Sequence, residues 1–97
     1  MIRWLTADDN NSLEINNYIS KKVLIYSVYP YYFQGVLAEI CDNNIFHIKS
    51  TPYRMLAFHQ TQVLLITKLD SYLIINPQII KYLNSTLPLK YRIRILI

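Results

Sequence analysis

The sequence predicts a mainly β protein with short helices, organised as a small barrel of strongly bent strands. Runs of β-branched and aromatic residues are separated by proline or by Asp and Asn, as in short strands joined by turns. The only glycine of the 97-residue chain, Gly35, falls inside one of these runs. Helix-like segments before the first run and after the last predict an N-terminal helix and a C-terminal helix-strand extension.

The composition indicates one folded domain. Hydrophobic residues make up 53% of the chain and charged residues 16%, which provides enough apolar surface for a core and disfavours disorder. We expect a single domain over 1–97, with the barrel core at 13–68 and the extension at 71–97. Because so small a domain has little interior, the remaining apolar side chains are expected to cover a partner, which predicts a homo-oligomer or a docked subunit.

Two segments carry helix signals. Residues 8–19 combine capping Asp, Asn and Ser residues with apolar positions at helical spacing, which predicts a short amphipathic helix. Asn76 is a suitable N-cap and Pro77 suits the first helical position, so a second helix is expected from Pro77 to about Asn84.

Strand signals occupy most of the remaining chain. The segments are 21–30, 31–41, 44–50, 53–60 and 62–69, the last being either a fifth strand or a continuation of the fourth. Segment 89–97 alternates apolar residues with Arg92 and Arg94, which predicts a final strand with cations on one face.

Gly35 predicts either a sharp bend or the close approach of a second backbone, where a Cβ would collide. The segment 36–41 is apolar without clean alternation at Val36, Leu37, Ala38, Ile40 and Cys41, so this strand is expected to be buried on both sides. Asp42–Asn44 predicts a hairpin turn, because Asp and Asn tolerate left-handed backbone.

Residues 13–68 resemble the Sm and Hfq family of small β-barrels. The matching positions are Ile15, Tyr18, Lys22, Val23, Phe33, Gly35, Leu37 and Asp42. The resemblance implies a Sm-like or SH3-like barrel, assembly into a ring and binding of uridine, with Asn43 or Asn44 as the base-binding asparagine. The chain departs from the family in having Tyr-Pro-Tyr-Tyr where a turn glycine is usual, and in lacking the Arg-Gly pair of the later loop.

The formal net charge of +4 and a pI near 9.3 favour attraction to nucleic acid or to an acidic partner. Candidate nucleic-acid-binding residues are the following: Tyr31, Tyr32, Asn43, Asn44, Lys90, Arg92 and Arg94. Tyrosines can stack on unpaired bases, amides can pair with base edges and cations can contact phosphates. Each also has a structural interpretation: the tyrosines as a subunit interface, the Asn residues as a turn and the cations as protection of an edge strand.

No arrangement of nucleophile, base and oxyanion donors is visible, so we expect no enzyme activity, no cofactor and no small-molecule substrate. Cys41 has no second cysteine with which to share a metal and is interpreted as a packed apolar residue. His47 and His59 are interpreted as surface or partly buried strand residues, and no metal site is expected. The lone cysteine fits a reducing cytoplasm, and no signal peptide or membrane helix is predicted.

Two functions follow from these observations. The first is a non-enzymatic Sm-like module that oligomerises and binds RNA or single-stranded nucleic acid. The alternative is a protein-interaction or assembly subunit with the same barrel and no nucleic-acid partner. Frequent Ile, Asn, Tyr and Lys indicate an AT-rich genome, such as that of a virus, plasmid or organelle.

Overall fold

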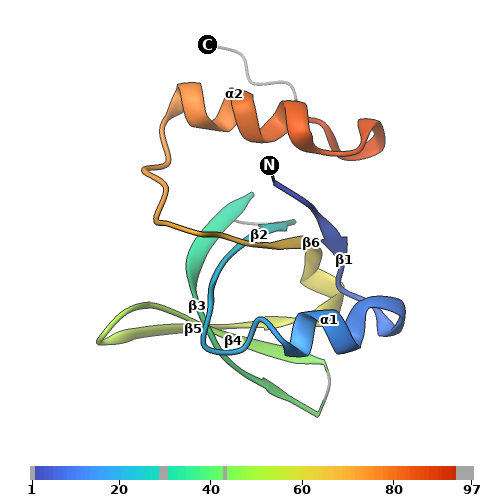
Figure 1. Cartoon of the computed structure of the whole chain (residues 1–97), viewed down its shortest axis with the longest axis vertical. Helices are drawn as coiled ribbons and strands as arrows, with labels where there is room; N and C mark the ends of the chain where they lie inside the picture. Colours follow the sequence, from blue (N-terminus) through green and yellow to red (C-terminus); the bar gives the residue numbers. More distant parts are fainter. Residues whose placement is uncertain (1, 29–30, 43, 94–97) are drawn as a thin grey trace.

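The computed structural model describes residues 2–28, 31–42 and 44–93 (Figure 1). In these ranges a six-stranded antiparallel sheet has the order β1-β6-β2-β3-β4-β5. The strands are β1 Leu5–Thr6, β2 Lys22–Ser27, β3 Tyr32–Cys41, β4 Ile45–Thr51, β5 Arg54–His59 and β6 Val63–Lys68. The helices are η1 Asp9–Asn11, α1 Ser12–Asn16, η2 Gln60–Gln62, α2 Pro77–Thr86 and η3 Leu89–Tyr91, where η denotes a 3-10 helix. The mainly β class with short helices is therefore confirmed, with the sheet open between β1 and β5.

The five predicted strands of segment 21–69 are present, and β6 is separate from β5 because η2 interrupts the chain between them. The helix predicted from Pro77 is also confirmed, with Asn76 Oδ1 accepting a hydrogen bond from the Ile79 N–H. Strand β1, whose two residues pair with β6, was not predicted from the sequence. None of the helices in the described ranges combines the length and the apolar character needed to cross a membrane.

The strand predicted for 89–97 is wrong at its beginning. Leu89–Tyr91 form η3, and positions 94–97 lie outside the described residues. The physical reason is packing: Tyr91 meets the ring of Tyr26 and Ile93 packs on the same cluster, which turns the chain back over the sheet. Among the described residues of this segment, 89–93, no strand is formed.

Strand β3 is strongly curved and belongs to both halves of the sheet (Figure 1). Its first part, Tyr32–Val36, pairs with β2, and its second part, Val36–Cys41, pairs with β4. Val36 belongs to both pairings, and Gly35 directly precedes it. A Cβ built there would be 2.7 Å from the Lys49 carbonyl oxygen and 2.7 Å from Ile48 Cγ2. The predicted close approach of a second backbone is therefore confirmed.

The concave side of the sheet encloses the main core. Apolar side chains from α1 and from all six strands meet there, and the rings of Phe33 on β3 and Phe58 on β5 lie 5.3 Å apart between centroids. The fully or nearly buried members are Leu5, Ala7, Ile15, Tyr18, Val23, Ile25, Leu37, Phe46, Ile48, Phe58, Val63 and Ile66. Curvature of the sheet is what brings β3 and β5 within contact across this core.

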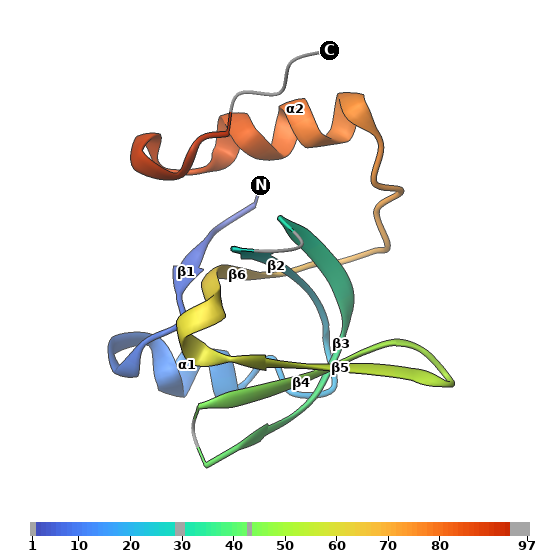
Figure 2. The same ribbon diagram turned by 180° about the vertical axis from the view of Figure 1, so that it is seen from behind.

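Burial on both faces occurs in β2, not in segment 36–41 as predicted. Val23 and Ile25 face the main core, whereas Leu24 and Tyr26 face an outer layer formed with α2 and the residues after it. In segment 36–41 only Leu37 is fully buried, and Glu39 is exposed. Figure 2 shows the reason, because α2 crosses the molecule above β2 and β6 and leaves the far end of β3 uncovered.

The turn between β3 and β4 is confirmed for its described residues. Asp42 has a positive φ of 52°, the left-handed conformation that Asp tolerates. The Asn44 N–H donates to the Cys41 carbonyl at 3.0 Å, which closes the turn. Asn43 lies outside the described residues.

We expect Gly35→Ala to lower the free energy of unfolding by about 1–3 kcal/mol, the usual cost of overpacking. The added methyl would meet backbone atoms of Lys49, which can move only by disturbing the ladder between β3 and β4. Chemical denaturation measures the effect. Ala57→Ser, on the exposed surface of β5, is the control and should change stability by less than about 0.5 kcal/mol. A stability gain in Gly35→Ala, as is usual when glycine is replaced at an unstrained position, would contradict the proposed contact.

Candidate functional site

A β-bulge in β3 places the potential metal ligands Glu39, Cys41 and His47 on the outer face of the sheet. Leu37 pairs with Ile48, but the next pair is Glu39 with His47, so Ala38 is the additional residue. Leu37 and Ile48 are buried in the core, and the shift directs Glu39 and His47 to the opposite face. Cys41, two residues after Glu39, lies on the same outer face because strand side chains alternate.

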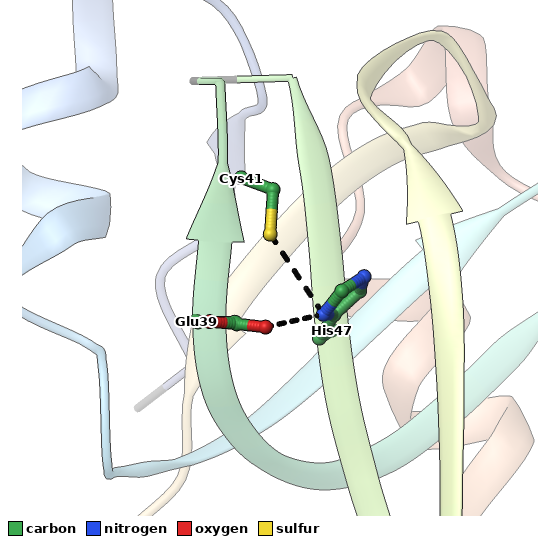
Figure 3. Close-up of side chains that lie close together, drawn as sticks. All are labelled: Glu39, Cys41 and His47. Atoms are coloured by element: carbon green, nitrogen blue, oxygen red, sulfur yellow. Dashed lines mark hydrogen bonds and ion pairs between the residues drawn. The ribbon is translucent and has the colours of Figure 1, made fainter.

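Glu39, Cys41 and His47 form a compact cluster (Figure 3). His47 Nδ1 lies 2.7 Å from Glu39 Oε1 and 3.9 Å from Cys41 Sγ. One ligand atom from each of the three residues lies within 4.8 Å of the other two. Glu39 is exposed, whereas Cys41 and His47 are half-buried. The cluster thus presents oxygen, sulfur and nitrogen donors at one point of the surface.

The electrostatics of the cluster keep the carboxyl group charged and the thiol protonated. Hydrogen bonding to His47, and then to Cys41, lowers the pKa of Glu39 below its ordinary value. Partial burial, and then the negative charge of Glu39, raises the pKa of the Cys41 thiol. At neutral pH Cys41 is therefore a thiol and not a reactive nucleophile.

Sequence reasoning missed this cluster because it compared His47 with His59 and treated Cys41 alone. His59 has a separate structural role, since its Nδ1 accepts a hydrogen bond from the Thr61 N–H and caps η2. The available signal was the Glu-Ile-Cys spacing, which puts two donors on one face of a strand. Only the register with the bulge could add His47 to them.

A second polar feature surrounds η2, which connects β5 to β6. The Gln60 N–H donates to the Asn44 carbonyl at 2.6 Å, and the Gln62 carbonyl accepts from the Val28 N–H at 3.2 Å. The turn before β4 and the connection before β3 therefore both contact η2. We call Val28, Tyr31, Asn44 and Gln60–Gln62 the link surface.

Two predicted site residues belong to the link surface. Tyr31 is 56% exposed, and its carbonyl accepts a hydrogen bond from the Ser27 N–H at 2.9 Å. Asn44 is half-buried, and its side-chain Oδ1 has no hydrogen-bond partner among the described residues. Tyr31 thus belongs to the connection before β3 and Asn44 to the turn before β4, the two segments that hydrogen-bond to η2.

Tyr32 is engaged in a structural contact. Its ring packs beside those of Trp4 and Tyr26, with centroid distances of 6.4 and 5.5 Å. Its hydroxyl donates to Oδ1 of Asn84 on α2, and burial raises the pKa of this phenol above its ordinary value. The side chain that the sequence placed among base-stacking candidates therefore anchors the outer helix.

The two described cations of the predicted set, Lys90 and Arg92, make different contacts. Lys90 Nζ lies 4.9 Å from the ring centroid of Tyr91, in cation–π geometry. Arg92 instead donates to the Leu87 carbonyl at 3.1 Å and to the Ser85 carbonyl at 3.3 Å, at the C-terminal end of α2. Asn43 and Arg94 lie outside the described residues. Among the described cations of this set, Lys90 therefore contacts an aromatic ring, whereas Arg92 is hydrogen-bonded to backbone carbonyls.

Comparisons with protein-family models, with curated proteins and with solved structures found no match to this chain. The interpretation of both surface features therefore depends on their geometry.

Removing the Tyr32 hydroxyl should loosen α2 from the sheet. Tyr32→Phe leaves Asn84 Oδ1 without its donor at a position only 8% exposed, which should cost about 1–3 kcal/mol of unfolding free energy. Denaturant titration provides the measurement. Tyr82→Phe makes the same chemical change on the exposed side of α2 and should leave stability within about 0.5 kcal/mol of the parent protein. Equal effects of the two variants would show that the Tyr32 contact does not hold the helix.

Proposed function

We propose that this chain is a non-enzymatic Sm-like module that oligomerises and binds RNA or single-stranded nucleic acid in the cytoplasm. The order β6-β2-β3-β4-β5 after an N-terminal helix, with a curved β3 and the close approach at Gly35, agrees with the barrel that the resemblance over residues 13–68 implies. Such a barrel requires a long curved strand that pairs with a different neighbour along each half, as β3 pairs with β2 and with β4.

The nucleic-acid proposal depends above all on one observation, the contact of η2 with the turn before β4. In the resemblance these two connections carry the base-binding asparagine and its partner loop, and here the Gln60 N–H donates to the Asn44 carbonyl at 2.6 Å. The Gln60 side chain and the NH2 group of Gln62 offer amide groups for the edges of unpaired bases. Gln62 Oε1 accepts from the His59 N–H at 2.8 Å and Asn44 Oδ1 is buried, so these two oxygens are held within the fold. The missing Arg-Gly pair is replaced by uncharged polar groups, which favours contact with bases over contact with phosphates.

Aromatic and cationic groups border the link surface. The ring of Tyr26 lies 6.2 Å from that of Tyr91 between centroids, and Tyr26 pairs across the strands with Tyr32, the residue after Tyr31. Lys90 lies over the ring of Tyr91. The exposed ring of Tyr31 supports stacking of an unpaired base, and the exposed Lys90 supports attraction of a phosphate.

Oligomerisation is supported by the open sheet. In the described residues β5 pairs only with β4, so one row of its backbone donors and acceptors is available to another copy. Met55 on β5 and several other large apolar side chains are exposed, which is consistent with a surface covered by a partner.

Nucleic-acid binding is tested by fluorescence anisotropy with labelled uridine-rich and adenosine-rich oligonucleotides at two salt concentrations. Affinity should fall at the higher salt concentration because phosphate contacts release counterions. Tyr31→Ala should weaken binding by about 5- to 150-fold, corresponding to about 1–3 kcal/mol for one lost stack.

Tyr53→Ala is the matched control for Tyr31→Ala. Tyr53 is 99% exposed but lies in the hairpin between β4 and β5, at the opposite end of β4 from Asn44. Its replacement should leave affinity unchanged. Absence of binding at low salt would reject the nucleic-acid function and favour the alternative, a protein-assembly subunit. Equal losses in the two tyrosine variants would reject the link surface as the binding site.

Light scattering coupled to gel filtration tests the assembly. The parent protein should elute as an oligomer, and Met55→Lys should increase the monomer fraction because a charge on an edge strand disfavours pairing with another edge. Leu13→Lys, which changes an exposed leucine of α1, should leave the oligomer intact. A monomeric parent protein at micromolar to millimolar concentration would contradict the proposal.

A further inference from the structure

We propose that Glu39, Cys41 and His47 bind a divalent zinc ion on the outer face of β3 and β4. This site goes beyond the nucleic-acid function and does not depend on it, because the cluster and the link surface share no residue.

The three donors are already arranged around a common point. In a tetrahedral zinc site with bond lengths of about 2.0–2.3 Å, neighbouring donor atoms lie about 3.3–3.7 Å apart. The observed separation of Cys41 Sγ and His47 Nδ1 is 3.9 Å, and that of Glu39 Oε1 and His47 Nδ1 is 2.7 Å. On zinc binding, the distance between Cys41 Sγ and His47 Nδ1 would shorten slightly, and that between Glu39 Oε1 and His47 Nδ1 would lengthen slightly. The Glu39 side chain is 60% exposed, so its carboxylate is free to make this adjustment.

The backbone holds the ligands in place. Glu39 and His47 are directly paired residues of adjacent strands, and Cys41 lies two residues farther along β3. Both strands are interior in the sheet, since β3 also pairs with β2 and β4 also pairs with β5. Ala57 is the partner of His47 on β5, and its methyl group leaves space beside the imidazole. The donor spacing is therefore fixed by the ladder and its bulge.

The donor set selects the ion. Thiolate and imidazole prefer zinc and similar transition metals, whereas magnesium and calcium prefer oxygen ligands. A carboxylate and a thiolate together supply two negative charges to balance a divalent cation. Binding places the metal on Nδ1 of His47, which leaves the imidazole proton on Nε2, and displaces the thiol proton of Cys41 to solvent. The fourth coordination position faces solvent, where water completes the tetrahedron.

Cobalt substitution gives a direct test on the full-length chain. Co²⁺ added to the metal-free protein should produce a thiolate-to-metal charge-transfer absorption in the near ultraviolet, and Zn²⁺ should abolish it by displacement. This band requires a Cys41–metal bond, so it does not depend on the folding of any variant. Absence of the band at saturating Co²⁺ would overturn the proposal and leave the cluster as a cross-strand hydrogen-bonded group.

Variants assign the ligands. Calorimetric titration with Zn²⁺ should show at least about a 10-fold loss of affinity in Cys41→Ser and in His47→Gln, since even indirect partners of a metal contribute about 10–100-fold. Circular dichroism establishes that each variant is folded. His59→Asn is the matched control, because it removes the other histidine while keeping an N-cap residue before η2. Zinc affinity that is unchanged in Cys41→Ser, or that is lost equally in His59→Asn, would also overturn the site.

Discussion

The close backbone approach between β3 and β4 at Gly35 sets the shape of the sheet on which everything else is built. No atom larger than hydrogen fits between the Gly35 Cα and the Lys49 carbonyl, since a Cβ would lie 2.7 Å from that oxygen. One residue later, at Val36, β3 passes from pairing with β2 to pairing with β4. The resulting curvature is what allows Phe33 and Phe58 to meet across the core, so a ten-residue strand serves two halves of one interior.

Once the sheet is bent, its two faces acquire different roles. The concave side is filled by side chains from α1 and the strands, and part of the convex side is covered by α2. Strand β2 is consequently buried on both sides, and the tyrosine pair Tyr26 and Tyr32 lies under the outer helix. Tyr32 and Trp4 fasten that helix by hydrogen bonds to Asn84 and Thr86. Tyr32, which the sequence predicted to stack on bases, thus helps to hold α2 on the sheet.

The uncovered parts of the sheet carry the polar chemistry. Beyond the reach of α2, the bulge at Ala38 exposes Glu39, Cys41 and His47 together. At the ends of the strands, η2 is hydrogen-bonded both to the turn before β4 and to the connection before β3, which together form the link surface. The two features share no residue, which permits metal binding and nucleic-acid binding to be tested separately.

Local structure could be predicted from the amino-acid sequence. Asn76 and Pro77 were sufficient to place the start of α2, Asp42 marked the turn before β4, and a glycine within an apolar run marked a close contact between strands. These features depend on the conformational limits of single residues, which neighbours in the chain reveal. Three other features became known only from the folded chain. They are the hydrogen bond of Tyr32 to Asn84, the 3-10 helix at Leu89–Tyr91 and the proximity of His47 to Glu39 and Cys41. Each depends on which residue lies opposite in space, and a one-residue bulge or a covering helix changes that partner without any local signal in the sequence.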